Sequence, residues 1–189
     1  MSTSVRITVA QYDEMIAEGQ FEPREEHHVE LIEGEIVAMC PIGPPHGDAL
    51  EILTEWSFDV RPRAEVKIRV QDSLGIPELE SVPEPDLYWA RRRPYRVRRP
   101  EASDILLLVE VSESSLAKDR GRKARLYARA GIRDYWIVDI AGQTVEVRRG
   151  PRNGTYQNTQ IFRPGDVIPL LAFPAITFPV DILFPPDTD

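Results

Sequence analysis

The sequence contains a single cysteine, Cys40, among its 189 residues. One thiol forms no internal disulfide and offers no zinc-binding framework, so we expect a protein of the reducing cytoplasm. There is no run of 18 apolar residues, and the first residues lack a basic start followed by an apolar block. We therefore expect neither a transmembrane helix nor a signal peptide, and no membrane partner.

Basic residues are scarce in the first half of the chain. Residues 1–89 carry 19 acidic and 6 basic side chains, whereas residues 90–189 carry 12 acidic and 17 basic ones. The net charge of −8 argues against a general nucleic-acid coat, because phosphate contacts require Lys and Arg. The basic second half still leaves room for a local site that binds a polyanion.

Periodicity and turn residues predict one α/β domain, a mixed sheet flanked by helices, over residues 1–189. The strand–helix–strand crossover at 105–139 should be parallel and right-handed. The expected elements are a helix at 8–17 capped by Thr8 and Gln11, a hairpin at 29–39 turning at Glu33-Gly34, a rigid loop at 41–45, a helix at 46–58, strands at 64–70, 86–90 and 105–111, a helix from Ser114 or Ser115 to Ala130, strands at 134–139 and 144–149, and short strands with Pro-rich turns beyond.

Two carboxylates, Asp86 and Glu110, stand at the ends of predicted buried strands. An unpaired buried charge costs several kcal/mol, and a divalent cation such as Mg²⁺ would make both carboxylates tolerable at once. We expect the crossover to set the two strands side by side. The alternative is structural: Asp86 would cap a turn after Pro85, and Glu110 would pair with an arginine.

Lys123 follows on the predicted helix, in a stripe with Asp119 and Tyr127 at i, i+4 and i+8. If the stripe packs over the strand end, the ammonium reaches the two carboxylates. The alternative is an ordinary Asp119–Lys123 helix pair worth about 0.3–0.5 kcal/mol. His46, at a helix start, is a candidate for phosphate contact or proton transfer, or else a solvated side chain.

An arginine-rich loop, residues 91–100, is the strongest local basic patch. Its arginines could hold a nucleic-acid backbone while Tyr95 stacks on a base, or the loop could be a solvated segment that offsets the acidic half. The candidate nucleic-acid contacts are Arg91, Arg92, Arg93, Tyr95 and Arg96, with Arg98 and Arg99 in the same run.

Several motifs together resemble the Uma-two family of restriction-endonuclease-like proteins in the PD-(D/E)XK superfamily. They are Glu30-Leu-Ile-Glu-Gly-Glu35, His46 after a Pro-rich loop, Pro85-Asp86, Val109-Glu-Val-Ser112, Asp119-Arg-Gly-Arg-Lys123 and the segment 126–139, and the resemblance covers roughly 8–180. It implies a restriction-endonuclease-like core and Mg²⁺-dependent phosphodiester hydrolysis, with Mn²⁺ as a substitute. By position, the resemblance implies that Asp86 and Glu110 bind the metal and that Lys123 is the catalytic lysine, with Glu30, Glu35 and His46 completing the site.

One position departs from the superfamily pattern, because Ser112 stands where a lysine is expected two residues after Glu110. The leading hypothesis is a Mg²⁺-dependent DNA endonuclease in which Lys123 replaces that lysine. The alternative is a catalytically inactive module that binds nucleic acid or a partner protein. A Lys123 ammonium more than about 8 Å from both carboxylates, beyond the reach of one bridging water, would favour the alternative. Pairing of sheet edges also suggests a homodimer.

Overall fold

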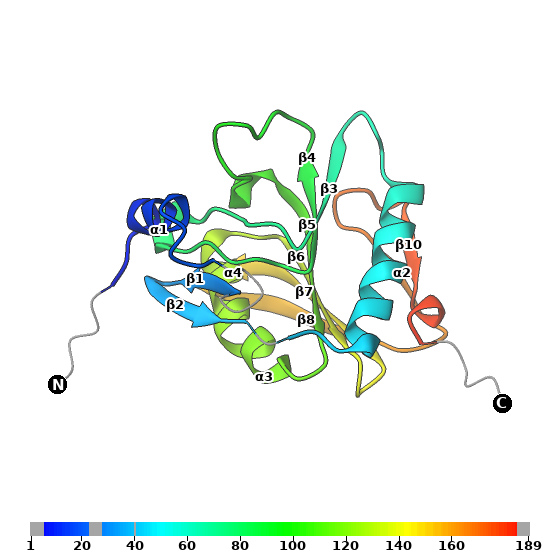
Figure 1. The fold of residues 1–189 in the computed structure, drawn as a ribbon. Coiled ribbons are helices and arrows are strands. Elements are labelled where there is room, and N and C mark those ends of the chain that lie inside the picture. The colour runs from blue at the N-terminus through cyan, green and yellow to red at the C-terminus, as the bar shows by residue number, and fades with distance from the viewer. Residues whose placement is uncertain (1–5, 23–27, 40, 185–189) are drawn as a thin grey trace.

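The computed structural model describes residues 6–22, 28–39 and 41–184. Cys40, on which the prediction of a reducing cytoplasm depends, lies outside the described residues. A six-stranded sheet forms the centre of the molecule, in the order β3-β4-β5-β6-β7-β8 (Figure 1). The strands are β3 (Val66–Val70), β4 (Leu87–Arg91), β5 (Ile105–Ser112), β6 (Asp134–Asp139), β7 (Thr144–Arg152) and β8 (Thr155–Phe162). Only β5 and β6 are parallel, and the other neighbours are antiparallel.

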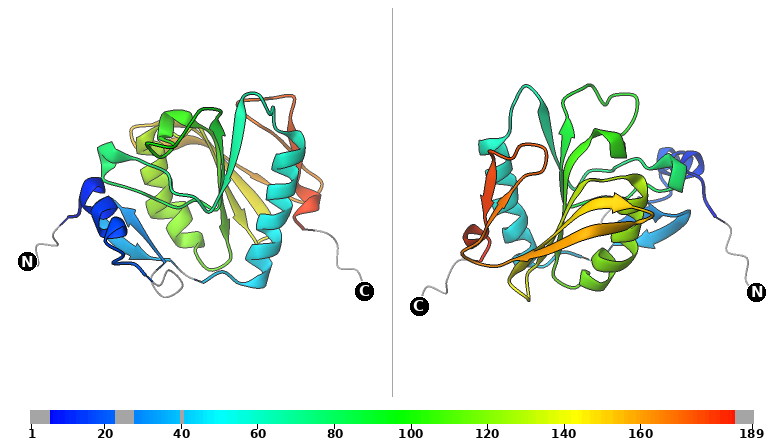
Figure 2. Two further views of the ribbon diagram at one scale, coloured as in Figure 1. Left: turned by 45° about the horizontal axis from the view of Figure 1, so that its top comes forward. Right: turned by 180° about the vertical axis from the view of Figure 1, so that it is seen from behind.

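Smaller elements cover the two faces of this sheet. Helix α2 (Pro44–Val60) and the β9–β10 ribbon (Val167–Pro169 and Thr177–Pro179) lie on one side, as Figures 1 and 2 show. The other side carries the remaining elements: α1 (Val9–Ala17), the hairpin β1 (Val29–Ile32) and β2 (Glu35–Ala38), and the helical segment made of α3 (Leu116–Lys118), a π-helical turn (Asp119–Lys123) and α4 (Ala124–Ala130). The predicted mixed α/β fold class is confirmed.

Strand β5 shows why the sequence folds this way. Its run Ile-Leu-Leu-Leu-Val-Glu-Val-Ser is buried along nearly its whole length, as expected of a central strand covered on both faces. Leu107 and Val109 face α2 and join a core that includes three tryptophans, whereas Leu108 packs on the α4 side. Because side chains alternate along a strand, Glu110 also points to the α4 side.

Most predicted elements are present, and the differences have local causes. The Thr8–Gln11 capping box, the turn at Glu33-Gly34 and the helix end at Gly131 are confirmed. The predicted loop at 41–45 is wrong at its end, because Pro44 and Pro45 occupy the first turn of α2, where their missing N–H groups cost nothing.

The β7–β8 hairpin is longer than the short strands we predicted for this region. Asn153 and Gly154, with φ of 53° and 74°, form its two-residue turn. Asn-Gly is the commonest signal of such a turn, so the sequence carried this information.

No helix in the described part of the chain combines the length and the hydrophobicity needed to span a bilayer.

Candidate active site

Asp86 and Glu110 face each other across the ends of two neighbouring strands. Leu87 of β4 pairs with Val109 of β5 in antiparallel register, so the next pair outward is Asp86 and Glu110. The predicted closeness of the two strands is confirmed, but its predicted cause is wrong. The crossover joins β5 to β6, whereas β4 meets β5 by antiparallel pairing through the arginine-rich segment.

The Asp86 carboxylate is held by two groups. Its Oδ2 accepts a hydrogen bond from the Val111 backbone N–H at 2.8 Å, and its Oδ1 lies 3.0 Å from Nε2 of His46. His46 is buried in the first turn of α2, so the expectation of a solvated histidine is wrong. The hydrogen bond to Asp86 raises the pKa of His46 despite its burial, which favours an imidazolium beside the carboxylate.

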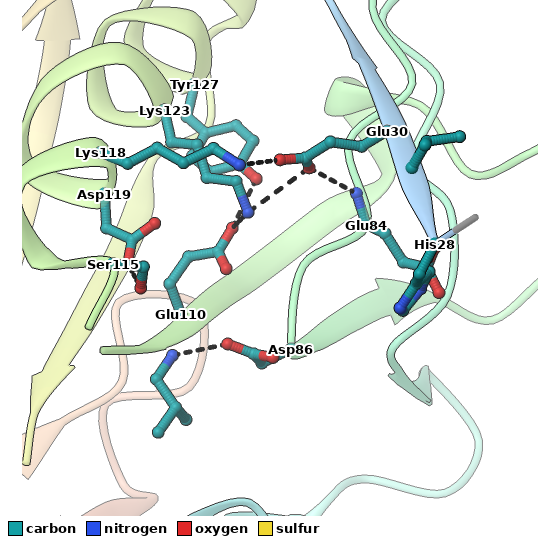
Figure 3. Close-up of polar contacts among 12 residues, drawn as sticks. His28, Glu30, Glu84, Asp86, Glu110, Ser115, Lys118, Asp119, Lys123 and Tyr127 are labelled. Carbon is teal, nitrogen blue, oxygen red and sulfur yellow. Dashed lines mark hydrogen bonds and ion pairs between the residues drawn. The ribbon is translucent and has the colours of Figure 1, made fainter. Parts of the chain in front are cut away.

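Glu110 receives two donors on one oxygen. Nζ of Lys123 lies 2.9 Å from Oε1, and the Tyr127 hydroxyl donates to the same atom at 2.7 Å. No residue that the structure describes donates to Oε2, which is turned away from the ammonium (Figure 3). Burial raises the pKa of Glu110, and the neighbouring Lys123 ammonium opposes this shift. The expected arginine partner is replaced by a lysine and a tyrosine.

Lys123 also approaches Glu30, which β1 brings from the hairpin. The ammonium lies 3.5 Å from Oε2 of Glu30, while Lys118 pairs with Oε1 (Figure 3). Burial alone would raise the pKa of Glu30, but the two lysines outweigh it and the pKa lies below its usual value. Burial likewise opposes the charge of Lys123, yet Glu110 and Glu30 raise its pKa above the usual value. Lys123 therefore stays an ammonium ion.

The π-helical turn at Asp119–Lys123 explains how the predicted stripe reaches the strand end. In a regular α-helix, a step of eight residues rotates a side chain by about 80° at about 100° per residue. The wider π turn reduces this rotation, and Asp119, Lys123 and Tyr127 are all buried. Asp119 accepts hydrogen bonds from the hydroxyls of Ser112 and Ser115, so the alternative Asp119–Lys123 pair does not form.

These side chains line one cleft of about 690 Å³. Its walls carry six carboxyl groups but only two lysines, Lys118 and Lys123. Asp86, Glu110, Lys123, Glu30 and His46 all line it. Glu35 is not among its lining residues, and its half-exposed side chain pairs with Arg122 at 2.8 Å.

His28 and Glu84 also line the cleft and were missed by the sequence reasoning, as were Lys118 and Glu113. Glu84 is buried and lies 3.2 Å from Nε2 of His28, and its backbone N–H donates to Glu30 at 3.3 Å. A signal existed, because residues two apart on an extended chain point to the same side. By that rule His28 accompanies Glu30, and Glu84 accompanies Asp86.

The arginine-rich loop lies at the other end of β4 from Asp86 (Figure 1). Five residues of strand separate them, or about 17 Å at about 3.3 Å per residue. Three arginines of the loop form ion pairs with residues outside it. Arg93 and Arg98 each pair with Asp104 at 3.0 Å, and Arg99 pairs with Asp13 at 2.6 Å. The exposed Arg91, Arg92 and Arg96 have no ion-pair partner among the described residues.

The donor set fits a cation that needs few protein ligands. Among residues 6–22, 28–39 and 41–184, no three His, Cys, Asp or Glu side chains are grouped to hold a metal ion. Mg²⁺, in contrast, is usually bound by one or two carboxylates together with waters and substrate phosphates. Asp86 and Glu110 offer such a pair in the cleft, since Oε2 of Glu110 accepts no hydrogen bond from the described residues.

A family model supports the resemblance seen in the motifs. The model of the Uma2 family, described as "Putative restriction endonuclease", matches residues 9–181. The chain belongs to the Uma2 family. The predicted resemblance is thus confirmed, and this Uma2 protein carries Ser112 where the superfamily pattern has a lysine, with its hydroxyl bonded to Asp119.

The fold of this Uma2 protein also has a solved counterpart. It is similar to the crystal structure of "a putative nuclease belonging to DUF820 from Anabaena variabilis ATCC 29413", with a TM-score of 0.67 and 20% sequence identity. The match covers 94% of this chain and 97% of the other. At this identity, the likeness shows a shared nuclease-like fold. No curated protein matches the chain.

Proposed function

We propose that this Uma2 protein is a divalent-cation-dependent endonuclease that hydrolyses phosphodiester bonds of DNA. The observation that carries the proposal is the Lys123 ammonium, 2.9 Å from Glu110 and buried in the cleft that also holds Asp86. This distance is far inside the limit of about 8 Å within which one water can bridge the groups. Lys123, on the following helix, would therefore take the role of the lysine that the superfamily pattern has at position 112.

The contacts of each side chain support a specific role in the proposed reaction. Asp86 and Glu110 would hold the cation, which when bound supplies a polarised phosphate oxygen and a more acidic water. Lys123, fixed by Glu110 and Glu30, positions the attacking water and stabilises the negative charge that develops on the phosphate oxygens. His46 holds Asp86 in place through the contact at 3.0 Å.

Cleavage of supercoiled plasmid DNA tests the proposal. Wild-type protein should nick or linearise the plasmid with Mg²⁺ or Mn²⁺, and Asp86→Ala should lose this activity. Asp48→Ala, which removes an exposed carboxylate from α2, is the matched control and should cut normally. Intact plasmid with wild-type protein and either cation would contradict the proposal. A parallel assay on RNA decides between the two nucleic acids.

The acidic cleft favours a second candidate, a nuclease-fold module that binds nucleic acid or a partner protein without cutting. Six carboxyl groups face two lysines in the cleft, and without a cation they repel a phosphate backbone, so a nucleic acid would bind outside the cleft and stay uncut. This candidate predicts binding of DNA, or of a protein partner, with no cleavage under any cation. The plasmid assay combined with a gel-shift measurement separates the two candidates.

We further propose a cytoplasmic location and a homodimer, both of which stay predictions from the sequence. Sedimentation at several protein concentrations tests the dimer, and fractionation of cells tests the location.

A further inference from the structure

Tyr127 is a buried side chain whose hydroxyl has one hydrogen-bond acceptor among the described residues. It lies on α4 one turn after Lys123 and is fully buried, with its ring edge-on to Tyr135 at a centroid distance of 5.1 Å. Its hydroxyl donates to Oε1 of Glu110 at 2.7 Å.

The hydrogen bond from Tyr127 restrains the terminal side-chain torsion of Glu110, which otherwise rotates easily. The terminal torsion of a glutamate has broad, roughly two-fold minima, so a carboxylate plane needs external contacts to be fixed. Lys123 and Tyr127 donate to the same oxygen of Glu110, at 2.9 and 2.7 Å. The ammonium is shared with Glu30, whereas the phenol hydroxyl donates to Glu110 alone among the described residues. Tyr127 is therefore the contact dedicated to this carboxyl group.

We propose that Tyr127 is a positioning residue for cation binding: by occupying Oε1 of Glu110 it fixes the carboxylate plane and presents Oε2 to the cation in the cleft. This inference rests on the cation-dependent function proposed above. It adds a residue that touches neither cation nor substrate and acts through Glu110. Tyr127 would orient Glu110 as an outer-shell carboxylate orients a metal-ligating histidine, through a hydrogen bond that fixes the ligand.

The test is the affinity for Mn²⁺, measured by calorimetry without DNA. Tyr127→Phe keeps the ring and removes the hydroxyl, and we expect it to raise the Kd for Mn²⁺ by about 10- to 100-fold, the usual effect of losing an orienting partner. Tyr88→Phe is the matched control. Tyr88 is equally buried, and its hydroxyl donates to the Ser73 carbonyl at 3.3 Å, away from the cleft. The control should bind Mn²⁺ like wild type.

Further readouts separate positioning from general loss of structure. The melting temperature of Tyr127→Phe should fall no further than that of Tyr88→Phe, and its Kd for DNA without a divalent cation should equal that of wild type. If the phenylalanine variant does not fold, Tyr127→Met removes the same donor with a side chain that adapts to its surroundings.

Two results would overturn the inference. Wild-type affinity for Mn²⁺ in Tyr127→Phe would reject the positioning role while leaving the proposed function intact. Wild-type protein that binds no Mn²⁺ would reject both.

Discussion

At the residue scale, the site is a set of charges that only tertiary structure makes tolerable. Asp86, Glu110 and Lys123 were predictable because each is a charge in an apolar strand or helix stripe. Glu84 was missed although it lies two residues before Asp86 on the extended chain. The hydroxyl of Tyr127 could not be assigned a partner from sequence, because its acceptor is 17 residues away on another element.

Lys123→Met should destabilise the protein by about 3–5 kcal/mol, since it leaves the buried Glu110 and Glu30 without their shared cation. Lys118→Met is the matched control: its side chain is 31% exposed and also pairs with Glu30, so its loss should cost at most about 1 kcal/mol. Urea unfolding followed by tryptophan fluorescence measures both. Equal losses in the two variants would contradict the buried-pair account.

At the element scale, the strands and most helices followed from periodicity, and the exceptions are informative. Two prolines at the start of α2 indicated a loop but form its first turn. The π-helical turn at Asp119–Lys123 has no sequence signature that propensity can detect, yet it brings the stripe onto one face. The order of β4 and β5 depends on a long-range antiparallel pairing, which local patterns do not encode.

Alanine should destabilise the protein at Gly131 and stabilise it at Gly47, although both glycines have open surroundings. A Cβ would meet nothing within 4 Å at either Gly131 or Gly47. Gly131 ends α4 with φ of 83°, so Gly131→Ala should cost about 1 kcal/mol through backbone strain. Gly47 lies inside α2, so Gly47→Ala should stabilise by about 0.5–1 kcal/mol. Chemical denaturation measures the two differences, and a shared sign would refute the explanation.

At the scale of the whole molecule, both halves of the chain contribute charges to the cleft. The first half supplies Glu30, Glu84 and Asp86, and the second half supplies Glu110, Glu113 and Asp119 together with both lysines, Lys118 and Lys123. The arginine-rich loop lies at the opposite end of β4 from Asp86, too far for its arginines to contact a phosphate group bound at the proposed site. If they bind DNA, they do so at a distance from the scissile bond.

Replacing Arg91, Arg92 and Arg96 together by alanine should weaken DNA binding without changing the maximal cleavage rate. Each lost phosphate contact should reduce the dependence of log K on log salt by about 0.9. Gel-shift titrations at several salt concentrations measure the slope, and saturating DNA isolates the cleavage rate. A wild-type slope in the triple variant would mean that the loop is a solvated segment that does not contact DNA.

The central claim is that Asp86 and Glu110 together hold a divalent cation. Its most direct test is a calorimetric titration of Mn²⁺ into wild-type protein and into Glu110→Gln, which keeps the shape of the side chain and removes its charge. The account predicts one saturable site in the wild type and its loss in the variant. Equal binding in the two proteins, or none in the wild type, would contradict it.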